Sequence, residues 1–155
     1  MKNSKTLRLF QFFLRNLICN HKNMFLGCDF RLITACDIGN LNECLAKGIT
    51  FAHPVGIVIS KSVKFLDGED GCKNNTIIWQ NVTIGAKNTN CDGYPTIGYN
   101  VKIYAGCVII GNIKIGNNAS IGANSVVLSD VPANAIVGGI PAKVIDFSST
   151  NGGLK

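Results

Sequence analysis

The sequence predicts an all-β fold, a β-helix built from short repeats, on two observations. First, apolar residues recur at intervals of six, at Ile97, Ile103, Ile109, Ile115, Ile121 and Val127. An amphipathic helix would repeat at about 3.6 residues and a simple strand at about 2, so neither accounts for this spacing. Second, a small or apolar residue follows four positions after each of them, namely Val101, Cys107, Ile113, Ala119, Ser125 and Val131. A hexapeptide period is a signature of β-helices, in which each unit is a short strand and a corner with two inward side chains.

Residues 1–36 are expected to form a basic, helical segment before the repeats. Six basic residues and one acidic residue lie within 1–31, so this segment carries most of the net charge of +6. The remainder is nearly neutral and offers no basic stripe, so no nucleic-acid partner is expected. Arg8 and Arg15 interrupt the apolar run, which argues against a signal peptide or a membrane span. Two interpretations stay open: a helix packed on the β-helix or its oligomer, or an interfacial helix that contacts a membrane.

The repeats are expected over residues 37–131, with an extruded loop at 86–96, and residues 132–155 are expected to form a C-terminal cap and tail. Tracing the register backward gives inward positions at Ile84, Ile78, Cys72, Phe65, Ile59, Phe51 and Leu45. On this register Cys72 and Cys107 would act as small buried hydrophobes. The seven cysteines include no CxxC pair, which is typical of a reducing compartment and indicates no metal site. A cytoplasmic location follows, with contact to the inner face of the membrane if the N-terminal helix is interfacial.

The register contains longer steps, and these carry the candidate chemistry because extra residues must bulge from the corners. The step from Phe51 to Ile59 contains His53, one of two histidines. An imidazole exchanges protons near neutral pH, so His53 is a candidate general base, although a corner histidine satisfied by backbone is an equally open reading. Cys91, in the loop after Ile84, has no histidine beside it and is read as incidental.

The combined pattern resembles the hexapeptide-repeat acyltransferases, in the branch of the serine acetyltransferases and the O-acetyltransferases of cell-surface polysaccharides. The segments that carry the resemblance are FAHPVGIVIS at 51–60, TIIWQNVTIGA at 76–86, and the repeats that end in VGGIPAKVI at 137–145. The resemblance covers about residues 37–145. It implies a left-handed parallel β-helix that assembles as a homotrimer, with active sites between subunits.

The resemblance also implies roles for individual residues. His53 matches the catalytic histidine, and Asp37 matches, after a shift of one residue, a more distant aspartate that orients it. Acetyl-CoA would be the co-substrate, and no metal is implied. The positions that would approach CoA are Ala86, Ala105 and Ala123 along the pantetheine arm and Lys143 near the nucleotide.

Two departures from the serine enzymes bear on the acceptor. Ala52 stands where those enzymes carry an aspartate before the histidine, and Tyr94 stands where they carry a second histidine. Because both residues are neutral, the sequence predicts an acceptor other than serine, a sugar hydroxyl of a surface polysaccharide (capsule, O-antigen or exopolysaccharide) or its precursor. Tyr94, Asn88 and Asp92 would contact that sugar. The alternatives are a serine O-acetyltransferase of cysteine biosynthesis and a non-catalytic β-helix that serves as a structural or binding subunit.

Overall fold

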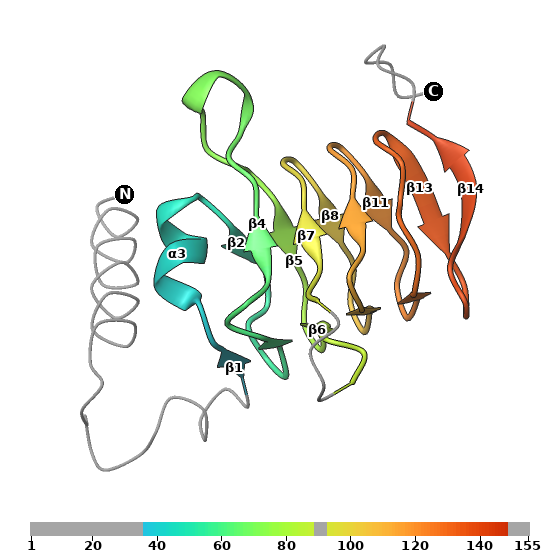
Figure 1. Ribbon diagram of the computed structural model, residues 1–155, viewed down its shortest axis with the longest axis horizontal. Helices are drawn as coiled ribbons and strands as arrows, with labels where there is room; N and C mark the ends of the chain where they lie inside the picture. Colours follow the sequence, from blue (N-terminus) through green and yellow to red (C-terminus); the bar gives the residue numbers. More distant parts are fainter. Residues whose placement is uncertain (1–35, 89–92, 149–155) are drawn as a thin grey trace, which may run out of the picture.

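A computed structural model describes residues 36–88 and 93–148 of the chain. The predicted N-terminal helix, Cys91 and the predicted sugar contact Asp92 therefore lie outside the described residues. The described chain is a left-handed parallel β-helix, as predicted, in which short strands alternate among three sheets (Figure 1). Its coils stack along the long axis of the molecule, from α3 at one end to β14 at the other.

Each sheet forms one face of a triangular prism. Sheet A contains β1 (Asp37–Ile38), β3 (Val58–Ile59), β6 (Thr83–Gly85), β9 (Val108–Ile110) and β12 (Val126–Val127). Sheet B contains β2 (Thr50–Phe51), β5 (Ile77–Ile78), β8 (Lys102–Ile103), β11 (Ser120–Ile121), β13 (Ala135–Gly138) and β14 (Lys143–Phe147). Sheet C contains β4 (Lys64–Phe65), β7 (Thr96–Ile97) and β10 (Lys114–Ile115), and Val131 bridges to Ile115 beyond it. The chain thus turns from B to A, from A to C and from C to B in every full coil.

The hexapeptide pattern places its two inward residues as predicted. The six residues from Ile97 to Val127 at the leading positions are at most 2% exposed, and those of the second set are at most 7% exposed. Stacked coils therefore bury a continuous aliphatic column. Burying one Ile or Val side chain contributes about 1.5–3 kcal/mol, so this column supplies most of the stabilisation of the fold.

Two inward positions expected from the sequence are wrong. Leu45 lies in a short helix, α3 (Leu41–Ala46), which takes the place of a sheet C strand in the first coil. Cys72 is exposed, in the loop that carries the 3-10 helix η1 (Glu69–Gly71) between β4 and β5. The extra residues at this corner leave as one loop instead of forming a coil. Asn74 closes the base of the loop, since its buried amide donates to the carbonyls of Leu66 and Gly98.

A ladder of asparagines supports the corner between sheets C and B. Asn75, Asn100, Asn118 and Asn134 occupy equivalent places in successive coils, all with positive φ. The Asn100 amide donates to the Asn118 side-chain oxygen at 2.8 Å, and Asn118 donates in turn to Asn134 at 3.1 Å. Asparagine tolerates the left-handed conformation that this corner demands, and its side chain bonds the next coil.

The C-terminal end of the β-helix is closed by an antiparallel strand. β14 pairs with β13 at the end of sheet B, with Gly138 opposite Lys143. Among the described residues, no helix has the length and apolar character needed to cross a membrane.

Candidate active site at one corner of the prism

His53 lies at the corner where the chain passes from sheet B to sheet A, hereafter the His53 corner. The backbone N–H of Ala52 donates to Ile78, and the N–H of Asn81 donates to Val55, which aligns Ala52 with Trp79 and Val55 with Gln80. His53 and Pro54 are therefore a two-residue insertion relative to the next coil. Both are exposed, so the insertion bulges outward and presents the imidazole at the surface. The sequence predicted this insertion from the eight-residue step.

Three of the four predicted CoA contacts lie on the same corner as His53. Ala105 and Ala123 follow β8 and β11 in successive coils, and the N–H of Asn124 donates to the carbonyl of Ala105 at 2.9 Å. Lys143 is exposed and pairs with Gly138, at the far end of the same row. From Ala52 to Lys143 the row crosses five strand spacings, or about 24 Å. The corner is thus a straight lane, hereafter the CoA lane, with His53 at one end and the Lys143 ammonium at the other; Ala105 and Ala123 lie along it, and so do two aromatic residues, Trp79 and Tyr104.

The remaining predicted contacts lie on a different corner, where the chain passes from sheet A to sheet C. Ala86 and Asn88 follow β6, and Tyr94 precedes β7. Asn88 is exposed, whereas Tyr94 is half-buried and packs against the core. Sheet A separates this corner from the His53 corner. One chain therefore does not bring Tyr94, Asn88 or Ala86 to His53.

Asp37, the predicted partner of His53, lies in the first coil beside the His53 corner. It opens β1 and aligns with Val58 of the His53 coil, and its backbone N–H donates to the carbonyl of Ile57 at 2.8 Å. Its side chain is exposed. The register places Asp37 one coil from His53, as an orienting residue requires, and a contact between the two side chains remains a prediction.

Two residues of the His53 corner were not singled out from the sequence. Trp79 and Tyr104 occupy the slot that directly follows the inward residue, where other units carry Gly98, Gly116 or Gly122. Their rings stack with centroids 4.7 Å apart and planes 23° apart. Aligning the units by the slot after the inward residue would have revealed these two aromatic residues beside Ala52 and His53.

Two of the three buried cysteines of the described chain, Cys44 and Cys107, do not offer a nucleophile. Burial raises the pKa of the Cys107 thiol to about 11, and burial together with the nearby Glu43 carboxylate raises that of Cys44 to about 12. Both thiols are fully protonated at neutral pH and lack the thiolate that attacks an acyl group. Within residues 36–88 and 93–148, no three His, Cys, Asp or Glu side chains gather as a metal site would require.

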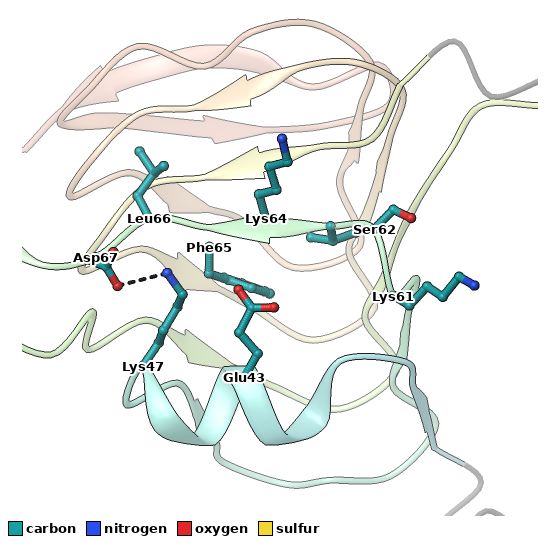
Figure 2. A pocket seen from close by; sticks show the side chains of 9 residues that line it. Glu43, Lys47, Lys61, Ser62, Lys64, Phe65, Leu66 and Asp67 are labelled. Carbon is teal, nitrogen blue, oxygen red and sulfur yellow. Dashed lines mark hydrogen bonds and ion pairs between the residues drawn. The ribbon is translucent and has the colours of Figure 1, made fainter.

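A cleft of about 600 Å³ lies away from this corner, between α3 and β4. Figure 2 shows Lys47 and Asp67 reaching toward each other there, 2.8 Å apart, while Lys64 points away from α3. None of the predicted site residues lines this cleft. Lys47 and Asp67 satisfy each other, and the other charged residues that line the cleft are Glu43, Lys61 and Lys64.

Comparison with known proteins identifies the repeat and its relatives. The family described as bacterial transferase hexapeptide (six repeats) matches residues 94–129. A serine acetyltransferase of Synechococcus elongatus is 40% identical over 116 residues, which cover 74% of this chain and 44% of that enzyme. The crystal structure of a Vibrio cholerae serine acetyltransferase superposes with a TM-score of 0.59 and 38% identity, over 66% of this chain and 38% of that one. A serine acetyltransferase solved in complex with CoA matches with a TM-score of 0.54 and 39% identity, over 63% and 37% of the two chains. This chain spans less than half the length of these relatives.

These relatives overturn the predicted sugar acceptor. The sequence favoured a surface polysaccharide, and so a glycan partner, because Ala52 and Tyr94 are neutral. The relatives that match across the repeats are instead serine acetyltransferases, the reading that the sequence held as its alternative. The inference failed because the neutrality of two positions, which lie on different corners of one chain, does not by itself identify an acceptor.

Proposed function

Because the β-helix of this chain belongs to the serine acetyltransferase-like branch of the hexapeptide-repeat acyltransferases, we propose that the protein transfers an acetyl group from acetyl-CoA to the hydroxyl of L-serine. The observation that carries the proposal is the arrangement of the His53 corner. His53, Ala105, Ala123 and Lys143 follow one another along a single row of coils. Acetyl-CoA would lie with its thioester beside the His53 imidazole, which can transfer a proton, and with its nucleotide phosphates beside the Lys143 ammonium, which can pair with them.

In the proposed reaction His53 acts as the general base. Its imidazole takes the proton of the serine hydroxyl while the oxygen attacks the thioester carbonyl carbon, and a tetrahedral oxyanion forms. The carbon–sulfur bond then breaks, and the imidazolium returns the proton to the departing CoA sulfur. Such proton transfer contributes about 10²–10⁴-fold, and positioning both substrates in one lane supplies a further large share.

CoA binding along the lane is supported by side-chain size and charge. Ala105 and Ala123 leave the backbone accessible to the pantetheine arm, whose amide groups can bond to peptide groups. Lys143 offers an exposed ammonium for a phosphate. Its neighbour across the strand pair is Gly138, which has no side chain to compete for that ammonium.

A homotrimer with composite sites is supported by the outward surfaces of the three sheets. The outward row of sheet A beyond Asp37 is uncharged, with Val58, Thr83, Val108 and Val126. Sheet C instead carries Lys64 and Lys114 in its outward row. If three prisms turn sheet A toward a common axis, the His53 corner of each meets the Tyr94 corner of the next. A closed ring then joins the two halves of the site that one chain separates.

The experiment that tests the function is an acetyl-transfer assay with the purified chain. CoA release is followed with a thiol reagent, and O-acetylserine is identified by mass spectrometry. We expect release to depend on L-serine and His53→Gln to lower kcat/KM at least about a hundredfold without changing the melting temperature, because the residue is exposed. Serine-independent release, or an active His53→Gln enzyme, would contradict the proposal.

The composite site has its own test. His53→Gln and Tyr94→Ala chains, each impaired alone, are mixed under conditions that exchange subunits. Partial recovery of activity is expected, since some interfaces then combine an intact His53 with an intact Tyr94. A monomer by light scattering, or mixtures that never recover, would contradict the trimer with shared sites.

A further inference from the structure

The aromatic stack at the His53 corner has one ring in each of two adjacent coils. The 4.7 Å between the Trp79 and Tyr104 centroids equals the spacing of neighbouring strands, about 4.7–4.9 Å. The rings therefore stack along the axis of the β-helix, and Tyr104 backs one face of the indole. The opposite indole face is turned toward the coil of β2, where His53 lies.

The residue that occupies the same slot in the β2 coil is too small to match an indole. Ala52 aligns with Trp79 through the hydrogen bond from its N–H to Ile78, at 2.9 Å. Its methyl group covers only a fraction of an indole, and the chain then bulges outward at His53. The face of Trp79 thus borders the space that an acceptor must occupy to bring its hydroxyl to the imidazole.

Charge at this corner is the second consideration. The residues that form it in successive coils, at 52–57, 79–82, 104–107, 122–125 and 138–142, include no carboxylate. A serine acceptor carries an ammonium, and an aspartate before the histidine would be its natural partner, but that position is Ala52. The carboxylate beside these residues is that of Asp37, one coil away in β1, which the family resemblance assigns to orienting His53. Within the five ranges, the groups that attract a cation are the aromatic faces and uncharged oxygens.

Resting on the proposed function, we propose that the face of Trp79, held in place by Tyr104, binds the ammonium of the amino-acid acceptor by a cation–π contact. Tryptophan is the strongest aromatic partner for a cation. Stacking on Tyr104 fixes the orientation of the indole before the ligand arrives, which lowers the entropic cost of binding.

The test uses the fact that Trp79 is the only tryptophan of the chain. Incorporating mono-, di- and trifluorotryptophan changes this one ring, nearly without changing its size, and withdraws electron density from its face. The KM for L-serine is expected to rise stepwise, by about tenfold in total, while the KM for acetyl-CoA stays constant. Trp79→Leu is expected to reproduce the rise, and Tyr99→Leu, which removes an aromatic residue from another corner, is the matched control.

Binding without turnover provides a second readout. The fluorescence of Trp79 is expected to change with L-serine and with ethanolamine, which keeps the ammonium, but not with 3-hydroxypropanoate, which lacks it. A KM for serine that is insensitive to fluorination overturns the inference and leaves the proposed function standing. A rise in the KM for acetyl-CoA instead also overturns it, because the stack then serves the other substrate. Absence of any serine turnover in the unmodified enzyme contradicts the proposed function itself.

Discussion

Replacing Asn118 separates the two contributions of the asparagine ladder to stability. Asn118 has a φ of 59°, accepts a hydrogen bond from Asn100 at 2.8 Å and donates one to Asn134 at 3.1 Å. Asn118→Gly removes both side-chain bonds but keeps a residue that adopts positive φ without strain. Asn118→Ala removes the same bonds and adds the cost of a Cβ in the left-handed region.

The magnitudes follow from these contacts. The bond to Asn100 is exposed and the bond to Asn134 is partly buried, so together they contribute about 1–2 kcal/mol. Glycine adds about 0.5–1 kcal/mol of unfolded-state entropy, which gives a loss of about 2 kcal/mol for Asn118→Gly. For alanine the left-handed conformation costs about 1–2 kcal/mol, which gives a loss of about 3 kcal/mol.

The assay is urea unfolding followed by circular dichroism at one fixed protein concentration, because the stability of an oligomer depends on concentration. Lys102→Ala, at an exposed outward position on β8, is the control and is expected to stay within about 0.5 kcal/mol of the wild type. If Asn118→Ala is as stable as Asn118→Gly, the backbone conformation contributes nothing. If both equal the wild type, the ladder itself is irrelevant to stability.

Three further predictions concern the buried thiols and the CoA lane. The folded pKa values of Cys44 and Cys107, about 12 and about 11, lie above the ordinary 9.0. The stability from their protonated state is therefore present below pH 9 and is lost as the pH rises toward 11–12, so the urea midpoint should fall over that range, less steeply in Cys107→Ala. Iodoacetamide at pH 8 should label the exposed Cys72 and spare the three buried thiols of the described chain, Cys36, Cys44 and Cys107, until urea is added, as peptide mass spectrometry can show. Ala123→Phe and Lys143→Glu should each raise the KM for acetyl-CoA at least about tenfold with the KM for serine unchanged, and an unaltered KM for acetyl-CoA would reject the lane.

The core of the fold was predictable where the six-residue repeat continues without insertions. From Ile97 to Val127 every inward position is buried as predicted, since a six-residue unit leaves no choice of which side chains face the column. The register failed at Leu45 and Cys72, where the chain departs from the unit. Seven extra residues between β4 and β5 can be distributed in several ways that sequence spacing alone does not distinguish. The buried amide of Asn74, which joins the two ends of the loop, decides between them.

The sequence named candidate site residues, whose roles stay predictions, but it did not give their arrangement. The eight-residue step located the His53 insertion, and the family resemblance supplied Ala86, Ala105 and Ala123 as one set. Their separation onto two corners depends on which sheet each preceding strand joins, β6 in sheet A against β8 and β11 in sheet B. Ala86, Ala105 and Ala123 all follow the break at Cys72, and the units counted from Ile84 through Ile97 to Ile103 separate them correctly. The misplaced coil at Cys72 instead adds one unit between His53 and Ala105, which hides that these two residues share a corner.

The three insertions into the described coils each lie at a different corner of the prism. The loop between β4 and β5 is held by contacts within the chain, whereas the other two insertions carry residues of the proposed site. A coil repeats its backbone almost unchanged, so a β-helix can vary only its outward side chains and the residues that leave its corners. The loop between β4 and β5 is tied down by Asn74, by the Lys47–Asp67 pair and by the Tyr99 hydroxyl, which donates to the Glu69 carboxylate. It lies opposite sheet A, whose outward row is uncharged beyond Asp37. The His53 insertion and the loop before Tyr94 instead flank sheet A, one on each side. If sheet A packs against other copies of the chain, the His53 corner of one copy therefore meets the Tyr94 corner of the next. The loop between β4 and β5 then stays in solvent.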